Sequence, residues 1–137
     1  MAFLIDTSIW VDVERGALSP GDVASLTGSE PVYLSPVTIA ELKFGAERAQ
    51  NPAVRQRRLA ALERLKKKPL LRIDEVTGDI FGTIAAVLAG ARRGPSFRVQ
   101  ALWLASQALQ HGLKLLTRNV KDFADIPGLE LMRVPEN

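Results

Sequence analysis

Three acidic residues stand where elements of a predicted sheet should end or begin. Asp6 directly follows the apolar run 3–5, Glu41 lies one turn into the helix expected after a second strand, and Asp122 lies just past a later strand. In a parallel sheet these positions converge on one edge, and gathered carboxylates repel one another unless a cation compensates them. Carboxylate oxygens suit Mg²⁺ or Mn²⁺, which can activate water at a phosphodiester. The spacing therefore predicts metal-dependent phosphodiester hydrolysis.

Each of these acids also has an ordinary structural interpretation. Asp6 could be only a helix N-cap. Glu41 could be a solvated helix residue, although its neighbours are apolar. Asp122 could belong to a turn, as could Asn119. Four other acids are interpreted as surface or capping residues: Asp12, Asp74, Glu75 and Asp79. From spacing alone, the metal site stays one hypothesis beside these alternatives.

Composition excludes several other kinds of chemistry. The 137 residues are expected to form a single domain, 1–137, large enough to bury a core. The absence of cysteine removes disulfides and thiolate chemistry, and a single histidine, His111, disfavours a histidine-rich metal site or a Ser-His-Asp triad. No apolar run approaches a membrane span, and the first residues lack signal-peptide features. A cytoplasmic protein without membrane association is expected.

The charge balance favours an anionic partner. The net charge is +3 and the isoelectric point about 9.6, which fits nucleic acid but also fits ordinary solubility charge. The basic residues gather in two stretches: Arg48, Arg55, Arg57, Arg58, Arg64, Lys66, Lys67 and Lys68, and then Arg92, Arg93 and Arg98. These stretches could contact RNA phosphates, which position a substrate without reading its sequence. Residues 64–68 could equally complement the dipole of a helix end.

Strands and helices are expected to alternate along the chain. The patterns predict strands at 2–5, 32–36, 69–74, 113–119 and 129–135, and helices at 9–16, 37–49, 51–68, 76–94 and 98–112. Alternation of this kind indicates a three-layer α/β/α fold with a mostly parallel sheet of four to five strands. Ligands of such sheets bind outside the carboxyl ends of the strands, where the three acids are expected.

Three blocks of the sequence resemble PIN-domain ribonucleases: LIDTSIW, SPVTIAELKFGAERA and LKLLTRNVKDFADIPGLEL. The similarity is closer to the VapC toxins of bacterial VapBC toxin–antitoxin pairs, and it spans Ala2 to about Leu131. The resemblance implies a PIN-like fold and a toxin that is an Mg²⁺- or Mn²⁺-dependent endoribonuclease. It also implies an RNA substrate, transfer RNA by family, a VapB-type antitoxin as partner, and a homodimer.

The resemblance assigns roles to individual residues. Asp6 matches the first metal-site acid, Glu41 the second and Asp122 the fourth. The polar residues beside them match supporting positions: Thr7 or Ser8, Thr117 and Asn119. The third acid of the family opens the helix that here reads ALWLASQAL, and its position holds Ala101.

Ala101 is the one departure from the family pattern at the site. Losing one of about four carboxylates is expected to weaken metal binding and disturb the attacking water, so activity of this chain is in doubt. Two explanations compete: natural decay into an inactive scaffold that binds protein or RNA, and a deliberate Asp→Ala substitution. Intact neighbouring blocks favour the second, and the codon in the source genome would separate them. A phosphoacceptor receiver domain is a weaker alternative, because no paired acid precedes Asp6 and Glu41 lies in a helix.

The helices from Thr38 to Lys68 resemble the pair that grips the antitoxin in such toxins. Six apolar residues would then line an antitoxin groove: Ile39, Leu42, Phe44, Leu59, Leu62 and Leu65. Alternatively, these side chains pack only within the core of the chain itself. Trp103 and Phe81 are interpreted as core or dimer contacts rather than as platforms for stacking bases.

Overall fold

The protein is described by a computed structural model that covers residues 2–91 and 98–134. Its sheet has four strands, β1 (Phe3–Ile5), β2 (Val32–Tyr33), β3 (Lys114–Thr117) and β4 (Leu131–Arg133). All neighbouring strands run parallel, in the order β2-β1-β3-β4. The α/β class and the parallel sheet predicted from the sequence are therefore confirmed.

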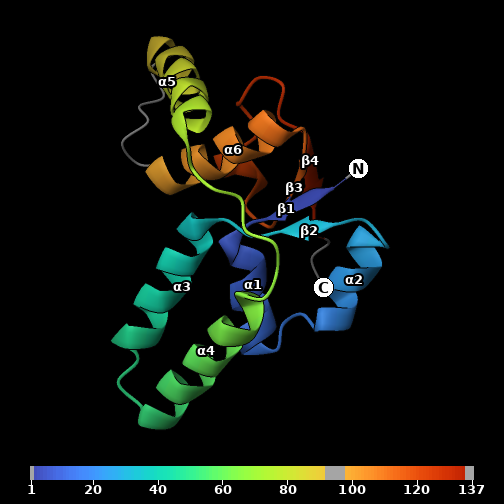
Figure 1. Ribbon diagram of the computed structural model, residues 1–137, viewed down its shortest axis with the longest axis vertical. Helices are drawn as coiled ribbons and strands as arrows, with labels where there is room; N and C mark the ends of the chain where they lie inside the picture. Colours follow the sequence, from blue (N-terminus) through green and yellow to red (C-terminus); the bar gives the residue numbers. More distant parts are fainter. Residues whose placement is uncertain (1, 92–97, 135–137) are drawn as a thin grey trace.

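Helices make up most of the remaining chain (Figure 1). They are α1 (Thr7–Arg15), α2 (Pro20–Thr27), α3 (Pro36–Arg48), α4 (Pro52–Leu65), α5 (Glu75–Gly90) and α6 (Val99–His111), with a short 3₁₀ helix η2 (Val120–Asp122). Prolines occupy the first turn of α2, α3 and α4, where their missing N–H costs no helical hydrogen bond. Gly112 ends α6 in the left-handed conformation, at φ 63°.

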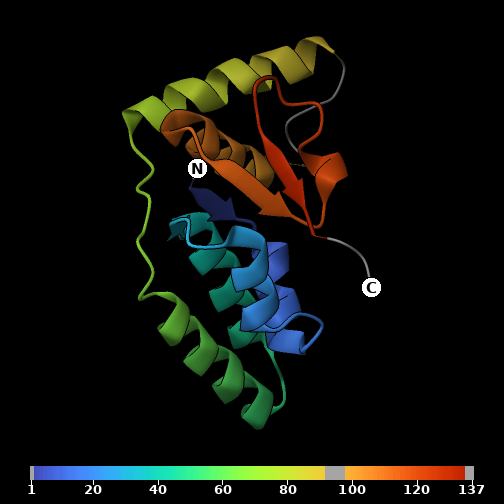
Figure 2. The same cartoon turned by 90° about the vertical axis from the view of Figure 1, so that its right-hand side faces the viewer.

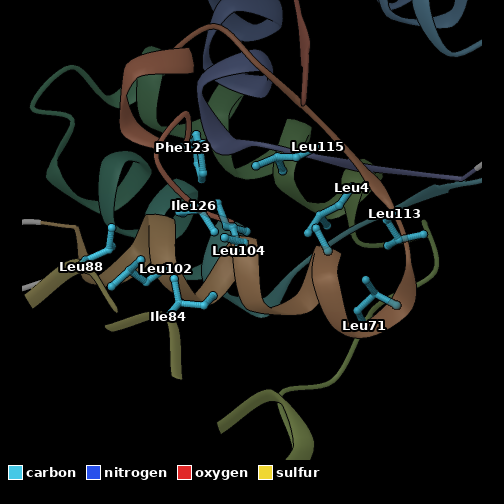
Figure 3. Packing of buried hydrophobic residues seen from close by; sticks show 12 residues of the cluster. Leu4, Leu71, Ile84, Leu88, Leu102, Leu104, Leu113, Leu115, Phe123 and Ile126 are labelled. Carbon is cyan, nitrogen blue, oxygen red and sulfur yellow. The ribbon is translucent and has the colours of Figure 1, made fainter. Parts of the chain in front are cut away.

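The alternation of side chains along the strands builds two cores, one on each face of the sheet. Leu4 and Leu115 point into a cluster with residues of α5 and α6, which Figure 3 shows from close by. Phe3, Ile5 and Leu116 point the other way, into a cluster with residues of α1 and α2. The sheet is thus covered on both faces, as the near-continuous apolar character of its strands requires.

The α3–α4 pair extends away from the sheet as an antiparallel hairpin (Figures 1 and 2). Both helices have the N-caps that their sequences indicate. The Ser35 hydroxyl accepts a hydrogen bond from the amide of Val37, and the Asn51 side chain accepts from Ala53 and Val54. A connector of residues 66–74 then returns the chain from α4 to α5 (Figure 2).

Two features of the fold differ from the sequence-based expectation. The segment 69–74 is not a strand: only Leu70 forms an isolated parallel bridge, to Leu34, before the connector leaves the sheet edge for α5. Helix α2 was not predicted, although Ser19 and Asp22 form a reciprocal capping box, a pattern that indicates the start of a helix. Arg92 and Arg93 of the second basic stretch lie outside the described residues. Within the described residues, no helix is long and apolar enough to cross a bilayer.

Candidate active site

Asp6 lies at the carboxyl end of β1, at the turn into α1. Its amide donates to the carbonyl of Leu116 at 2.9 Å, which continues the pairing of β1 with β3. Its carboxylate oxygen Oδ2 accepts hydrogen bonds from the hydroxyls of Ser8 at 2.7 Å and Thr117 at 2.8 Å. The side chain makes no capping hydrogen bond to α1. Asp6 thus occupies the N-cap position of α1 without capping the helix through its side chain, and two hydroxyls instead hold its carboxylate beside the adjoining strand.

Glu41 is joined to the same region through Thr7. The Thr7 hydroxyl donates to Oε1 of Glu41 at 2.8 Å and shares a second hydrogen bond with the hydroxyl of Thr38 at 3.0 Å. The pKa of Glu41 is raised, first by burial and also by the negative charge of Asp6, while the hydrogen bond from Thr7 opposes the shift. Glu41 is therefore half-buried rather than fully solvated, and its charge is unfavourable where it lies.

All the expected site acids line one cavity of about 460 Å³. Its walls include Asp6, Glu41 and Asp122, and also Ala101 on the first turn of α6. Thr7 and Asn119 line it as well, and Thr117 lies behind Asp6. In residues 2–91 and 98–134, no three acidic or histidine side chains stand close enough together to hold a metal ion. The carboxylates are thus distributed along the walls of the cavity without closing around one point.

The cavity also holds charged residues that sequence reasoning did not assign to it. Asp12 lines it and forms an ion pair with Arg118, so its interpretation as a surface or capping residue is wrong. Arg98 lines it and forms an ion pair with Asp125. Arg15 lines it too. The signal for Arg118 was its place between Thr117 and Asn119, two residues already singled out. Arg98 was singled out only as a member of the second basic stretch, which did not indicate this cavity.

The donor chemistry of the cavity suits a hard divalent cation, although its three expected acids do not surround one point and position 101 carries no carboxylate. The acidic side chains offer only oxygen atoms as ligands. A bound cation would offset the repulsion between the negative charges of Asp6 and Glu41. Ala101 is half-buried on the wall of the same cavity, while its neighbours Leu102 and Leu104 are buried in the core. An aspartate at this position would add a carboxylate to those of Asp6, Glu41 and Asp122, at a position that also packs against the core.

A buried polar contact anchors the start of the helix that carries Glu41. Gln107 on α6 is fully buried; its Oε1 accepts from the Ser35 hydroxyl at 2.5 Å, and its Nε2 donates to the carbonyl of Leu71 at 2.9 Å. Ser35 is itself the N-cap of α3. Gln107 therefore joins α6, the α4–α5 connector and the start of α3.

We expect Gln107→Ala to lower the free energy of unfolding by about 2–4 kcal/mol, because it leaves buried polar partners unsatisfied and opens a cavity. Urea denaturation measures this loss. The matched control is Gln100→Ala on the exposed side of the same helix, for which the change should stay below about 0.5 kcal/mol. Equal effects of the two substitutions would contradict an anchoring role for Gln107.

The groove predicted from α3 and α4 is present with half of its expected lining. A cavity of about 550 Å³ between α1, α3 and α4 is lined by Leu42, Leu62 and Leu65, and also by Trp10. Ile39 and Leu59 are half-buried outside it, and Phe44 is 66% exposed. The cavity lined by Asp6, Glu41 and Asp122 is called the acidic cavity below. The groove meets it at Val11, Arg15 and Glu41, which line both. Elsewhere, Phe81 and Trp103 pack against each other, with ring centroids 4.2 Å apart.

Comparison with known proteins identifies the family. The sequence matches the PIN domain over residues 3–129, nearly the whole chain. The chain belongs to the PIN-domain family. Among relatives of this PIN domain, ribonuclease VapC1 of Rickettsia felis is 33% identical over 98% of this chain and 97% of its own length. The tRNA(fMet)-specific endonuclease VapC of Shigella flexneri is 29% identical over 94% and 95%.

Solved structures of VapBC proteins also resemble this chain. The DNA-bound VapBC structure from Salmonella typhimurium superimposes on this PIN domain with a TM-score of 0.81 and 26% identity, over 97% of this chain and 98% of that chain. The resemblance to VapC proteins stated from the sequence blocks is therefore confirmed, and so is the PIN-like fold.

Proposed function

We propose that this PIN domain is the toxin of a type II toxin–antitoxin pair and that its cavity is the site of metal-dependent RNA cleavage. The observation that supports this most is the convergence of Asp6, Glu41, Asp122 and Ala101 on one cavity. In this proposal Asp6, Glu41 and Asp122 hold Mg²⁺ or Mn²⁺. The bound ion would supply an activated water and stabilise the charge that develops on the phosphodiester. RNA cleavage by the chain and by its Ala101→Asp variant, with either ion, tests the proposal.

The neighbouring side chains have positioning roles in this proposal. Ser8 and Thr117 hold one oxygen of Asp6, so that the other oxygen stays available to a ligand. Thr7 orients Glu41 in the same way. Asn119 precedes the η2 helix that ends at Asp122, and its amide donates to the Thr117 hydroxyl at 2.9 Å. These hydrogen bonds connect the ends of β1 and β3 to the acids. They hold the acidic side chains in place before an ion binds.

We infer the partners from the relatives. VapBC structures resemble this chain, and a VapB-type antitoxin is the partner that we propose for the groove lined by Leu42, Leu62 and Leu65. Transfer RNA is the proposed substrate, by analogy with the tRNA(fMet)-specific relative. We also propose that the protein forms a homodimer and acts in the cytoplasm.

Ala101 supports a second candidate function, in which the chain binds RNA or protein as an inactive PIN scaffold. The alanine removes a carboxylate from the cavity and leaves the other lining acids in place. Under this alternative, restoring an acid at position 101 brings no metal-dependent cleavage. The endoribonuclease and an RNA-binding scaffold share RNA binding, so the binding surface can be tested separately from cleavage.

Arg15 is the arginine that we expect to contact an RNA phosphate. Of the three arginines lining the acidic cavity, Arg98 and Arg118 have carboxylate partners, whereas Arg15 has no ion pair within the described part of the chain. Arg15→Gln should weaken binding of a single-stranded RNA and lower the slope of log affinity against log salt by about 1. Fluorescence anisotropy at several salt concentrations measures both. Lys66→Gln, an exposed cation already paired with Glu63, is the control; an equal effect there would refute the assignment.

A further inference from the structure

Arg98 joins two segments at the cavity wall, the start of α6 and the segment around η2. It occupies the N-cap position of α6, and its carbonyl accepts the first hydrogen bond of that helix, from the amide of Leu102 at 2.8 Å. Its side chain reaches the other segment, around η2. Arg98 is one helical turn before Ala101, so the residue that begins α6 also sets the place of position 101.

The guanidinium makes a two-pronged ion pair and a third bond. Nη1 donates to Oδ2 of Asp125 at 3.0 Å, and Nη2 donates to Oδ1 of Asp125 at 2.8 Å. Nη2 also donates to the backbone carbonyl of Asp122. The planar fork of arginine matches a carboxylate in this way, whereas the ammonium of lysine acts as a point charge.

Burial distinguishes this ion pair from the surface pairs of the molecule. The side chains of Arg98 and Asp125 are 11% and 26% exposed. The exposed pair between Lys66 and Glu63 on α4 has side chains 40% and 71% exposed. Water screens an exposed pair and leaves it little effect on structure, but a sheltered and bidentate pair restricts the segments that it joins.

The bond to the Asp122 carbonyl fixes the residue that carries the proposed metal ligand. The last carbonyls of a short helix have no partner within it, and Arg98 supplies one at the end of η2. The backbone of Asp122 is held at this carbonyl and at its amide, which donates a hydrogen bond to the carbonyl of Asn119. The remaining freedom of Asp122 is mainly rotation of its side chain. The direction of its carboxylate is then set relative to α6.

We propose that Arg98 is a positioning residue that holds Asp122 at a fixed place relative to position 101, through Asp125 and the Asp122 carbonyl. This inference rests on the proposed function, because the geometry that it preserves is that of the metal-binding acids. It assigns Arg98 to the protein scaffold rather than to the RNA. Outer partners of metal ligands commonly affect metal affinity by about 10–100-fold.

The test combines hydrogen exchange with binding of Mn²⁺ alone. The amides of Asp122, Phe123 and Ala124 are hydrogen-bonded within the η2 segment and report its order. In Arg98→Gln and in Asp125→Asn, these amides should exchange about 10-fold faster, while amides in the middle of α6 stay unchanged. In the Ala101→Asp background, the Mn²⁺ dissociation constant, measured by calorimetry, should rise about 10-fold in both variants.

Arg98→Lys separates positioning from charge. A single ammonium nitrogen does not reproduce the planar fork that matches both Asp125 oxygens, so this variant should behave like Arg98→Gln. Lys66→Gln, which breaks an exposed pair on α4, should change neither readout.

Four results would overturn the proposal: unchanged exchange at residues 122–124, faster exchange spread evenly over the whole chain, full rescue by lysine, or loss of RNA affinity with normal exchange. If the η2 amides respond as expected but the Ala101→Asp parent binds no Mn²⁺, the positioning role is supported and the proposed metal-dependent function fails.

Discussion

Ala101→Asp is expected to increase metal-dependent RNA cleavage at least about 100-fold over the unaltered chain, since even outer partners of metal ligands change activity by that order. The position lies on the wall of the cavity that Asp6, Glu41 and Asp122 line, on the first turn of α6. Ala101 is half-buried and also packs against the core, so the fold of the variant is checked by circular dichroism beside the cleavage assay. A fourth carboxylate there would complete the oxygen ligands of the proposed site.

The assay uses a transfer RNA pool with Mg²⁺, with Mn²⁺ and with EDTA. Asp6→Ala in the Ala101→Asp background is the control for a contaminating nuclease, and it should abolish the gained activity. Gln100→Asp places an acid one residue away on the same helix and tests whether charge alone suffices. A correctly folded Ala101→Asp variant without metal-dependent cleavage would favour the inactive scaffold instead.

Glu41→Gln is expected to have opposite effects on activity and stability. In the Ala101→Asp background it should lower cleavage about 100-fold, because a neutral amide replaces a proposed metal ligand. Without divalent metal at neutral pH, the same substitution should stabilise the fold. Burial and the charge of Asp6 both oppose ionised Glu41, and glutamine removes that penalty while it can still accept the hydrogen bond from Thr7.

The pH dependence follows from the raised pKa of Glu41. Above its unfolded value of 4.5, the folded chain keeps a proton that the unfolded chain has already lost. The free energy of unfolding contributed by Glu41 is therefore complete below that pH and is lost as pH rises through the raised folded pKa. Urea denaturation from pH 4 to 8 in EDTA should show this loss in the parent and not in Glu41→Gln. Glu63→Gln, on the exposed side of α4, is the matched control; equal pH profiles of parent and Glu41→Gln would contradict the account.

The sheet and most helices could be predicted because local patterns agree with the tertiary structure. The apolar run 3–5 is a strand buried on both faces, and Asn51 with Pro52 begins α4 as its sequence indicates. The segment 69–74 was wrongly predicted to be a strand because it contains several apolar residues. Of these, Leu71 packs into the core, whereas Leu70 and Ile73 are exposed on a connector.

Sequence reasoning could predict Asp6, Glu41 and Asp122 at the site, but not the fourth lining acid, Asp12, or the arginines. Acids at strand ends follow from the topology of a parallel sheet, which brings Asp6 and Asp122 to one edge. The partners of Arg98 lie 24 and 27 residues away, so no local pattern could indicate them. The same holds for Arg118 with Asp12 and for Gln107 with Ser35, whose contacts exist only after the helices pack.

Asp6, Glu41, Asp122 and position 101 are proposed to form one metal site. A crystal of the Ala101→Asp variant soaked in Mn²⁺ tests it directly, through anomalous scattering from the ion. We expect a peak within coordination distance of Asp6, of the introduced aspartate and of Glu41 or Asp122, and no such peak in Asp6→Ala. Saturating Mn²⁺ with no peak in this cavity would contradict it.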